Sequence, residues 1–203
     1  MSRDGARTGL DVSGLPSVVF SHRSLMWWGT LGVMAIEGMA FALAIMAYFY
    51  LRSHSNTWPM AARPPDLVWG TINTFLMVAS IVPAYLAKRA AEARRVRGVR
   101  LWLCVSIAFA LVFVAVRAAE FATLNVRWDS SAYGSVVWLL LGLHTAHILT
   151  DLLDTVVLAV LFFTGPLEGK RFSDVTDNSF YWFFVVGAWI PIYLVIYFGA
   201  RVA

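Results

Sequence analysis

Five long runs of apolar residues constrain this chain more than any other feature of its sequence. They cover residues 25–51, 68–87, 101–124, 136–163 and 180–200. Each run is long enough to span a membrane, since about 20 helical residues cross a hydrocarbon core roughly 30 Å thick. Within lipid each run must be helical, because unpaired backbone amides are costly there and the sequence lacks the alternating pattern of barrel strands. The sequence therefore predicts an all-α membrane protein with five transmembrane helices in a single membrane domain over residues 1–203.

The composition is too apolar for a soluble protein. Apolar side chains make up 60% of the chain and charged ones only 14%, which excludes an ordinary soluble enzyme and a disordered tail. The single cysteine, Cys104, allows neither a disulfide framework nor a CxxC metal motif. The net charge of +4 does not indicate a nucleic-acid partner, because six of the sixteen basic residues lie between residues 88 and 100, as in a cytoplasmic loop.

The Lys and Arg residues of the connecting segments predict the orientation. Eleven of them lie in a polar N-terminal arm over residues 1–24 and in the second and fourth loops, whereas the first loop, the third loop and the C-terminus hold four. Because positive loops stay on the cytoplasmic side, we predict the N-terminus inside and the C-terminus outside. The first run is too long for a cleavable signal, so we expect it to be retained. Asn178 or Ser179 is the predicted N-cap of the last helix.

Seven ionisable residues fall inside the predicted spans and are the candidate functional residues: Glu37, Arg117, Glu120, His144, His147, Asp151 and Asp154. Each costs on the order of 3 kcal/mol near the bilayer centre, so each should face protein or a water-filled cavity. The spacing 144, 147, 151, 154 places four of them on one face of the fourth predicted helix. Arg117 and Glu120 likewise share a face of the third. We therefore expect a buried polar network, with Glu37 close to the level of Asp151.

Three interpretations of these residues compete. His144 and His147 with the neighbouring acids could bind a transition metal, Glu37 and Asp151 could relay protons, or the groups could pair with one another as a purely structural network. A metal site is disfavoured because only two of the four histidines lie in the spans. Two axial haem ligands on one helix face are also disfavoured. The sequence thus predicts no metal site and no catalytic residue.

Islands of sequence in a fixed order are similar to a known family. They include Trp28-Gly29 and Glu37 in the first run, Asn73-Thr74, Glu120-Phe121, Tyr133-Gly134-Ser135, Gly142-Leu143-His144-Thr145-Ala146-His147, Tyr181-Trp182, Trp189 and Tyr197. Together they resemble subunit III of the haem-copper oxidases, over residues 24–199. Five helices resemble the shorter bacterial form of that family.

The resemblance implies a non-redox accessory subunit of a respiratory terminal oxidase, cytochrome c oxidase, in a bacterial inner membrane. It implies direct contact with subunit I, neighbouring subunit II and other oxidase subunits, no cofactor in this chain, and haem and copper in the partner subunits. It also implies a V-shaped arrangement of a two-helix and a three-helix bundle around a lipid-filled cleft with bound phospholipid, the first two helices forming the smaller bundle. Such a subunit stabilises the catalytic subunit and supports its proton uptake, and Glu37 aligns with the family's carbodiimide-reactive glutamate.

Several residues depart from the family's pattern. Phe183 and Val186 stand where the family has a histidine and an aspartate, Arg117 replaces a glutamine, and Asp151 and Asp154 occupy small or apolar positions. We therefore hypothesise a rearranged network in which Arg117 pairs with Glu120 or with an acid of the fourth helix. Two alternatives remain: the accessory subunit of a nitric oxide reductase from the same family, and a small proton-coupled transporter. The chain shows no inverted repeat that would favour the transporter.

Overall fold

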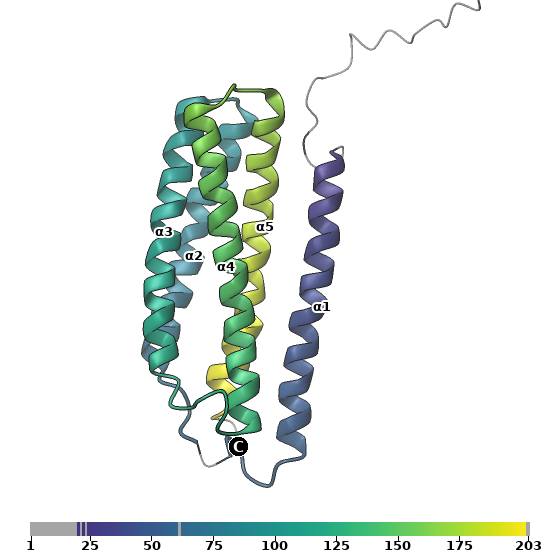
Figure 1. Ribbon diagram of the computed structural model, residues 1–203, viewed down its shortest axis with the longest axis vertical. Helices are drawn as coiled ribbons and strands as arrows, with labels where there is room; N and C mark the ends of the chain where they lie inside the picture. The colour runs from purple at the N-terminus through teal and green to yellow at the C-terminus, as the bar shows by residue number, and fades with distance from the viewer. Residues whose placement is uncertain (1–19, 21, 23, 61, 202–203) are drawn as a thin grey trace, which may run out of the picture.

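The chain folds into five long helices. The computed structural model describes residues 20, 22, 24–60 and 62–201, and its helices are α1 (Leu25–Ser53), α2 (Leu67–Glu92), α3 (Val96–Ala122), α4 (Ala132–Thr164) and α5 (Gly169–Tyr193). A single π-helical turn, η2 (Leu194–Phe198), continues α5 (Figure 1). All five are long and apolar enough to cross a membrane, and the described part of the chain contains no strand. The predicted all-α fold with five spans is confirmed.

Several helices extend beyond the apolar runs. α2 continues to Glu92, α3 begins at Val96, and α5 begins at Gly169 instead of residue 180. Hydropathy falls where a helix leaves the hydrocarbon, but helical backbone can continue into the polar interface. Asn178 and Ser179 therefore lie inside α5, and the predicted cap was wrong, since Glu168 occupies the N-cap position. Most of the polar arm predicted over residues 1–24 lies outside the described residues.

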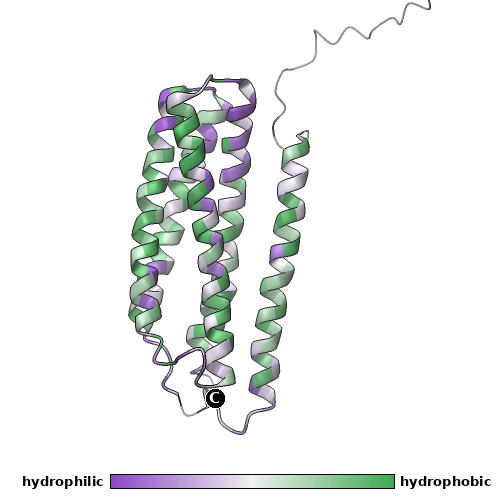
Figure 2. Cartoon of the chain, viewed as in Figure 1, coloured by the Kyte–Doolittle hydropathy of each residue, from purple (hydrophilic) through white to green (hydrophobic). Residues whose placement is uncertain are grey.

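Helices α2 to α5 form a bundle, and α1 lies beside it against α4 and α5 (Figure 1). The largest fully buried side chains of the bundle include Trp189, Arg117, Tyr197, Phe113 and Met77. Only three residues of α1 are buried: Phe41, Ala44 and Tyr48. Figure 2 shows apolar residues along most of each helix, with hydrophilic residues at the bundle ends and at a few places within. Helix α1 is thus the least embedded of the five.

The expected pairing of α1 with α2 as a separate two-helix bundle is not found. Helix α2 packs along α3 and α5, whereas α1 packs on α4 and α5. Only residues 93–95 connect α2 to α3, so α3 must fold back directly along α2. Their contact includes the small residues Ala87 and Ala91, which share a buried cluster with Val99 and Leu103. Small residues let helix backbones approach closely in a membrane protein.

Arginine side chains fix the ends of the bundle. The Arg100 Nε group donates to the carbonyl oxygen of Phe162 at 2.9 Å, which satisfies one of the orphan carbonyls in the last turn of α4. At the other end, Arg201 Nη2 donates to the carbonyl oxygen of Pro65 at 2.5 Å. The chain end after η2 is therefore tied to the segment that leads into α2.

Candidate functional site

The centre of the bundle holds a buried ion pair from α3. Arg117 and Glu120 are 2% and 1% exposed, and Arg117 Nη1 lies 2.9 Å from Glu120 Oε2. The sequence left two partners open for Arg117, and the structure places it against Glu120 instead of an acid of α4. Because desolvating two charges is expensive, such a pair is favourable only when further hydrogen bonds satisfy both groups.

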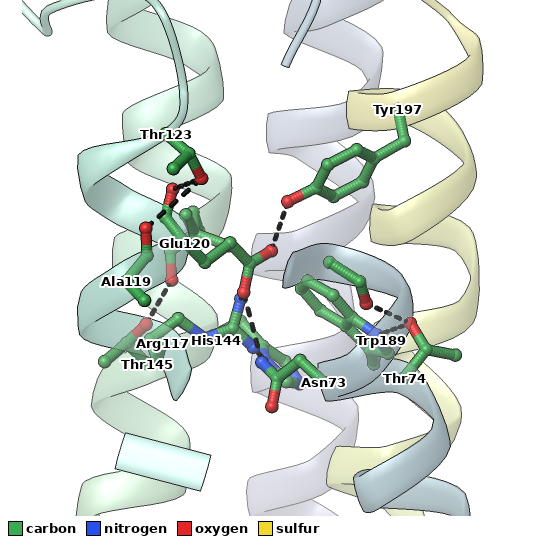
Figure 3. Close-up of polar contacts among 12 residues, drawn as sticks. Asn73, Thr74, Arg117, Ala119, Glu120, Thr123, His144, Thr145, Trp189 and Tyr197 are labelled. Atoms are coloured by element: carbon green, nitrogen blue, oxygen red, sulfur yellow. Dashed lines mark hydrogen bonds and ion pairs between the residues drawn. The ribbon is translucent and has the colours of Figure 1, made fainter. Parts of the chain in front are cut away.

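The Glu120 carboxylate receives these further bonds from two other elements. Asn73 Nδ2 of α2 donates to Oε2 at 3.1 Å, and the Tyr197 hydroxyl of η2 donates to Oε1 at 2.5 Å. Figure 3 shows Glu120 between these two side chains. Bonds to an ionised acceptor are shorter and stronger than bonds between neutral groups. Glu120 therefore joins three elements of the bundle through one carboxylate.

A glycine on α2, Gly70, leaves space for the ring of Tyr197. Gly70 lies on α2 beside the ring of Tyr197, and a Cβ atom at residue 70 would overlap that ring. The hydroxyl can reach Glu120 only because the ring lies against this bare stretch of backbone. Gly70 thus supports the network without contributing a polar atom.

Arg117 also contacts α4 and α5. Its guanidinium carbon lies 4.2 Å from the centroid of the Trp189 ring, within the range of a cation–π contact, and its Nη2 lies 3.3 Å from Nδ1 of His144. Arginine can only donate, so Nδ1 accepts and the imidazole proton is on Nε2. Nε2 lies 3.0 Å from the carbonyl oxygen of Val185 and donates to it. His144 is therefore neutral, and both of its nitrogens are occupied.

A second polar contact links α1 to the bundle. Oε1 of Glu37 lies 3.3 Å from Nε2 of His147, and the two side chains are 22% and 11% exposed. The other ring nitrogen of His147, Nδ1, lies 2.6 Å from the carbonyl oxygen of Leu143. A carbonyl oxygen only accepts, so Nδ1 carries a proton.

One further proton must lie between Glu37 and His147. Without it, the lone pair on Nε2 would face a lone pair on an ionised carboxylate. The contact is favourable as an imidazolium with a carboxylate or as an imidazole with a carboxylic acid. The remaining Glu37 oxygen, Oε2, is buried with no hydrogen-bond partner among the described residues, and Tyr181 of α5 interacts with the same carboxyl group.

The two aspartates of α4 share one amide on α5. Asn178 Nδ2 donates to Oδ1 of Asp151 at 3.3 Å and to Oδ2 of Asp154 at 3.1 Å. The Thr155 hydroxyl donates to the Asn178 oxygen at 3.3 Å. Asp151 is 7% exposed and lines a cavity of about 20 Å³ between the helices, enough for one water molecule.

The seven sequence-predicted residues thus divide into three groups: Arg117, Glu120 and His144; Glu37 and His147; Asp151 and Asp154. Glu37 contacts His147 and not Asp151. His147 and Asp151 lie one turn apart on α4. Sequence reasoning missed several partners: Asn73, Asn178, Trp189 and Tyr197. Three of these were visible as islands of the family resemblance, but Asn178 lay outside the apolar runs and was singled out only as a candidate helix cap.

Among the described residues, no three His, Cys, Asp or Glu side chains come together as a metal site would require. Each histidine of α4 instead bonds a backbone carbonyl and a charged side chain. The side chains of this site can instead bind a proton, as at Glu37 and His147, and connect helices, as at Arg117 and Glu120.

Fold and site together define a multi-pass helical membrane protein in which several buried ionisable side chains contact one another across the helices. The sequence model of the family described as Cytochrome c oxidase subunit III matches residues 63–201. The chain belongs to this family, the subunit III family of the haem-copper oxidases.

Curated relatives extend the similarity over most of the chain. Cytochrome c oxidase subunit 3 of Corynebacterium diphtheriae is 29% identical over 176 residues, covering 84% of this chain and 86% of the relative. The subunit 3 of Thermostichus vulcanus is 25% identical, covering 89% of this chain and 90% of the relative. A probable cytochrome c oxidase subunit 3 of Mycobacterium tuberculosis is 30% identical, with coverage of 84% and 86%. These relatives suggest that the chain is part of an oxidoreductase complex.

Proposed function

We propose that this chain is the non-redox subunit III of a cytochrome c oxidase in a bacterial inner membrane, with its N-terminus on the cytoplasmic side. It contacts subunit I directly and shares the complex with subunit II, and these partners carry the haem and copper. The observation that carries the proposal is the family match over residues 63–201, together with relatives of similar length that are named cytochrome c oxidase subunit 3.

The buried network supports a stabilising role toward the catalytic subunit. Arg117 and Glu120 join all four bundle helices through side chains on α2, α4 and α5 with η2. A bundle held in this way keeps its outer faces in fixed positions. Those faces expose large apolar side chains, which either lipid or an apolar partner surface would cover in the membrane.

The Glu37–His147 pair supports a role in proton uptake. The pair holds one shared proton within the spanning part of α1 and α4, where it can store the proton or release it without a metal. Tyr181 of α5 interacts with Glu37 and also with Asp151, which lies one turn along α4 from His147. Losing the shared proton would leave two acceptors opposite each other and weaken the contact.

A lipid-filled cleft beside α1 is the third part of the proposal. Added Cβ atoms at Gly29 and Gly32 would meet nothing within 4 Å, so this part of α1 is open along one side. An acyl chain could lie against that side, and Glu37 lies two turns further along the same helix. A phospholipid there would cover apolar surface that α1 does not bury against the bundle.

Purification tests the assignment. A tagged copy of this chain should bring down a larger complex that contains haem and copper and consumes oxygen, with subunits I and II identified by mass spectrometry. Reduction of nitric oxide instead of oxygen would identify the alternative family branch. A chain that purifies without partners and transports a substrate in vesicles would overturn the proposal.

A further inference from the structure

A groove at the end of α2 and the start of α3 is separate from all the sites above. It encloses about 520 Å³ and is lined by Tyr85, Arg89, Ala90, Arg95, Gly98 and Trp102, among others. Its volume falls within the range of small-molecule sites. Its lining includes the small residues Ala90 and Gly98, and a Cβ atom at Gly98 would already lie 3.0 Å from that of Ala90. The two helices are therefore close together here. The larger side chains that line the groove, which we call its rim, are those of Tyr85, Arg89, Arg95 and Trp102.

The rim is positively charged. Arg89 donates from Nη1 to the Tyr85 hydroxyl at 3.1 Å and is exposed. Among the described residues, no carboxylate lies within ion-pair distance of Arg89 or Arg95; the nearby Glu92 lies 3.9 Å from Lys88. The segment over residues 88–100 carries six basic residues and one acidic residue. The groove thus offers two guanidinium groups to an anion.

An exposed apolar surface of α2 leads away from the groove. Tyr85 and Trp102 are residue types that gather at the headgroup level. Val82 and Val78 lie three and seven residues before Tyr85, hence on the same face of α2, and are 57% and 48% exposed. An occupant with an anionic head and an apolar tail would match both parts.

We propose that this groove binds the headgroup of an anionic phospholipid, with the phosphate between Arg89 and Arg95 and the acyl chains along the exposed valines of α2. Arginine is suited to this role because its planar donors match phosphate oxygens. The exposed valines of α2 favour a lipid over an acidic protein segment, because acyl chains would cover this apolar surface and acidic side chains would not. Basic pockets between transmembrane helices are known to bind such headgroups.

Native mass spectrometry of the complex containing the full chain tests the site. The complex is titrated with phosphatidylglycerol, cardiolipin or phosphatidylcholine. This chain is then released from the complex in the gas phase, and the lipid molecules that remain bound to it are counted. The double variant Arg89→Gln/Arg95→Gln should lower the affinity for phosphatidylglycerol about thirtyfold, since each arginine that bonds the phosphate directly contributes about a factor of five. The matched control, Arg94→Gln/Arg97→Gln, removes equal charge from the same loop outside the groove and should leave the affinity within about threefold.

A second variant leaves the charge unchanged. Ala93→Phe fills the groove from an exposed lining position and should also abolish lipid retention, with complex yield as the check on folding. Equal losses in both double variants would overturn the site in favour of a diffuse charged surface. Equal binding of phosphatidylcholine, or equal competition by inorganic phosphate alone, would overturn the anionic lipid as ligand. Loss of a protein subunit with lipid binding unchanged would assign the groove to a partner. Because lipid is read on this chain itself, the test is independent of the oxidase assignment.

Discussion

Glu37 of α1 and His147 of α4 face each other at 3.3 Å with one proton between them, because the other nitrogen of His147 already donates to a backbone carbonyl. This contact links the least embedded helix to the bundle. It gives Glu37 a partner within this chain, apart from the buried pair of Arg117 and Glu120.

Replacing Glu37 separates its two proposed roles. Glu37→Gln keeps a donor for His147 Nε2 but removes the titratable proton, so α1 should stay in place while proton uptake at alkaline pH slows. Glu37→Ala removes the contact and should weaken the attachment of α1 by about 1–3 kcal/mol. Proton uptake by reconstituted complex and protease sensitivity of α1 are the measurements. Equal uptake rates in Glu37→Gln and the parent would reduce the pair to a structural contact.

Removing Arg117 should be severely destabilising. Arg117→Ala leaves the Glu120 carboxylate buried without its cation, which costs about 3–5 kcal/mol. We expect a lower yield of assembled complex and an earlier thermal transition in detergent. A second substitution, Glu120→Gln, should recover part of the loss because it removes the unpaired charge. An Arg117→Ala complex of normal yield and stability would contradict the role of the network.

Gly70 should be intolerant of the smallest change. In Gly70→Ala the new methyl group overlaps the ring of Tyr197, so the hydroxyl is displaced from Glu120. We expect a loss of about 1–3 kcal/mol, as for overpacking in a core. Gly142→Ala is the control, because a Cβ there meets nothing within 4 Å. That change should be neutral or stabilising by up to about 1 kcal/mol, since alanine favours a helix. Equal thermal shifts for the two variants would disprove the steric argument.

Asn178 should matter because it separates two carboxyl groups. Asn178→Leu removes both donors from Asp151 and Asp154 and leaves a buried acid without its partner, with an expected loss of about 1–3 kcal/mol. Adding Asp151→Asn should restore part of the stability, because it removes the buried group that can carry an uncompensated charge. Thermal unfolding of both variants measures the effect. No rescue by the second change would show that Asn178 acts through packing alone.

The sequence by itself determined the class of fold. Apolar runs of this length can only be helices in lipid, and the same argument singled out the ionisable residues that needed partners. It did not find the true ends of α5 or the N-cap at Glu168, because a helix can continue beyond the hydrocarbon that the apolar pattern measures.

Only the tertiary structure decided which charge meets which partner. Spacing along one helix made Glu120 one of two possible partners of Arg117, and the structure selected it. Tyr197 against Glu120 and Asn178 between two aspartates depend on how far each helix is rotated and shifted against its neighbours. Helices of similar length and hydropathy can pack in several such arrangements. Side-chain shape therefore selects one of them, such as the space that Gly70 leaves for a tyrosine ring, and the apolar pattern does not.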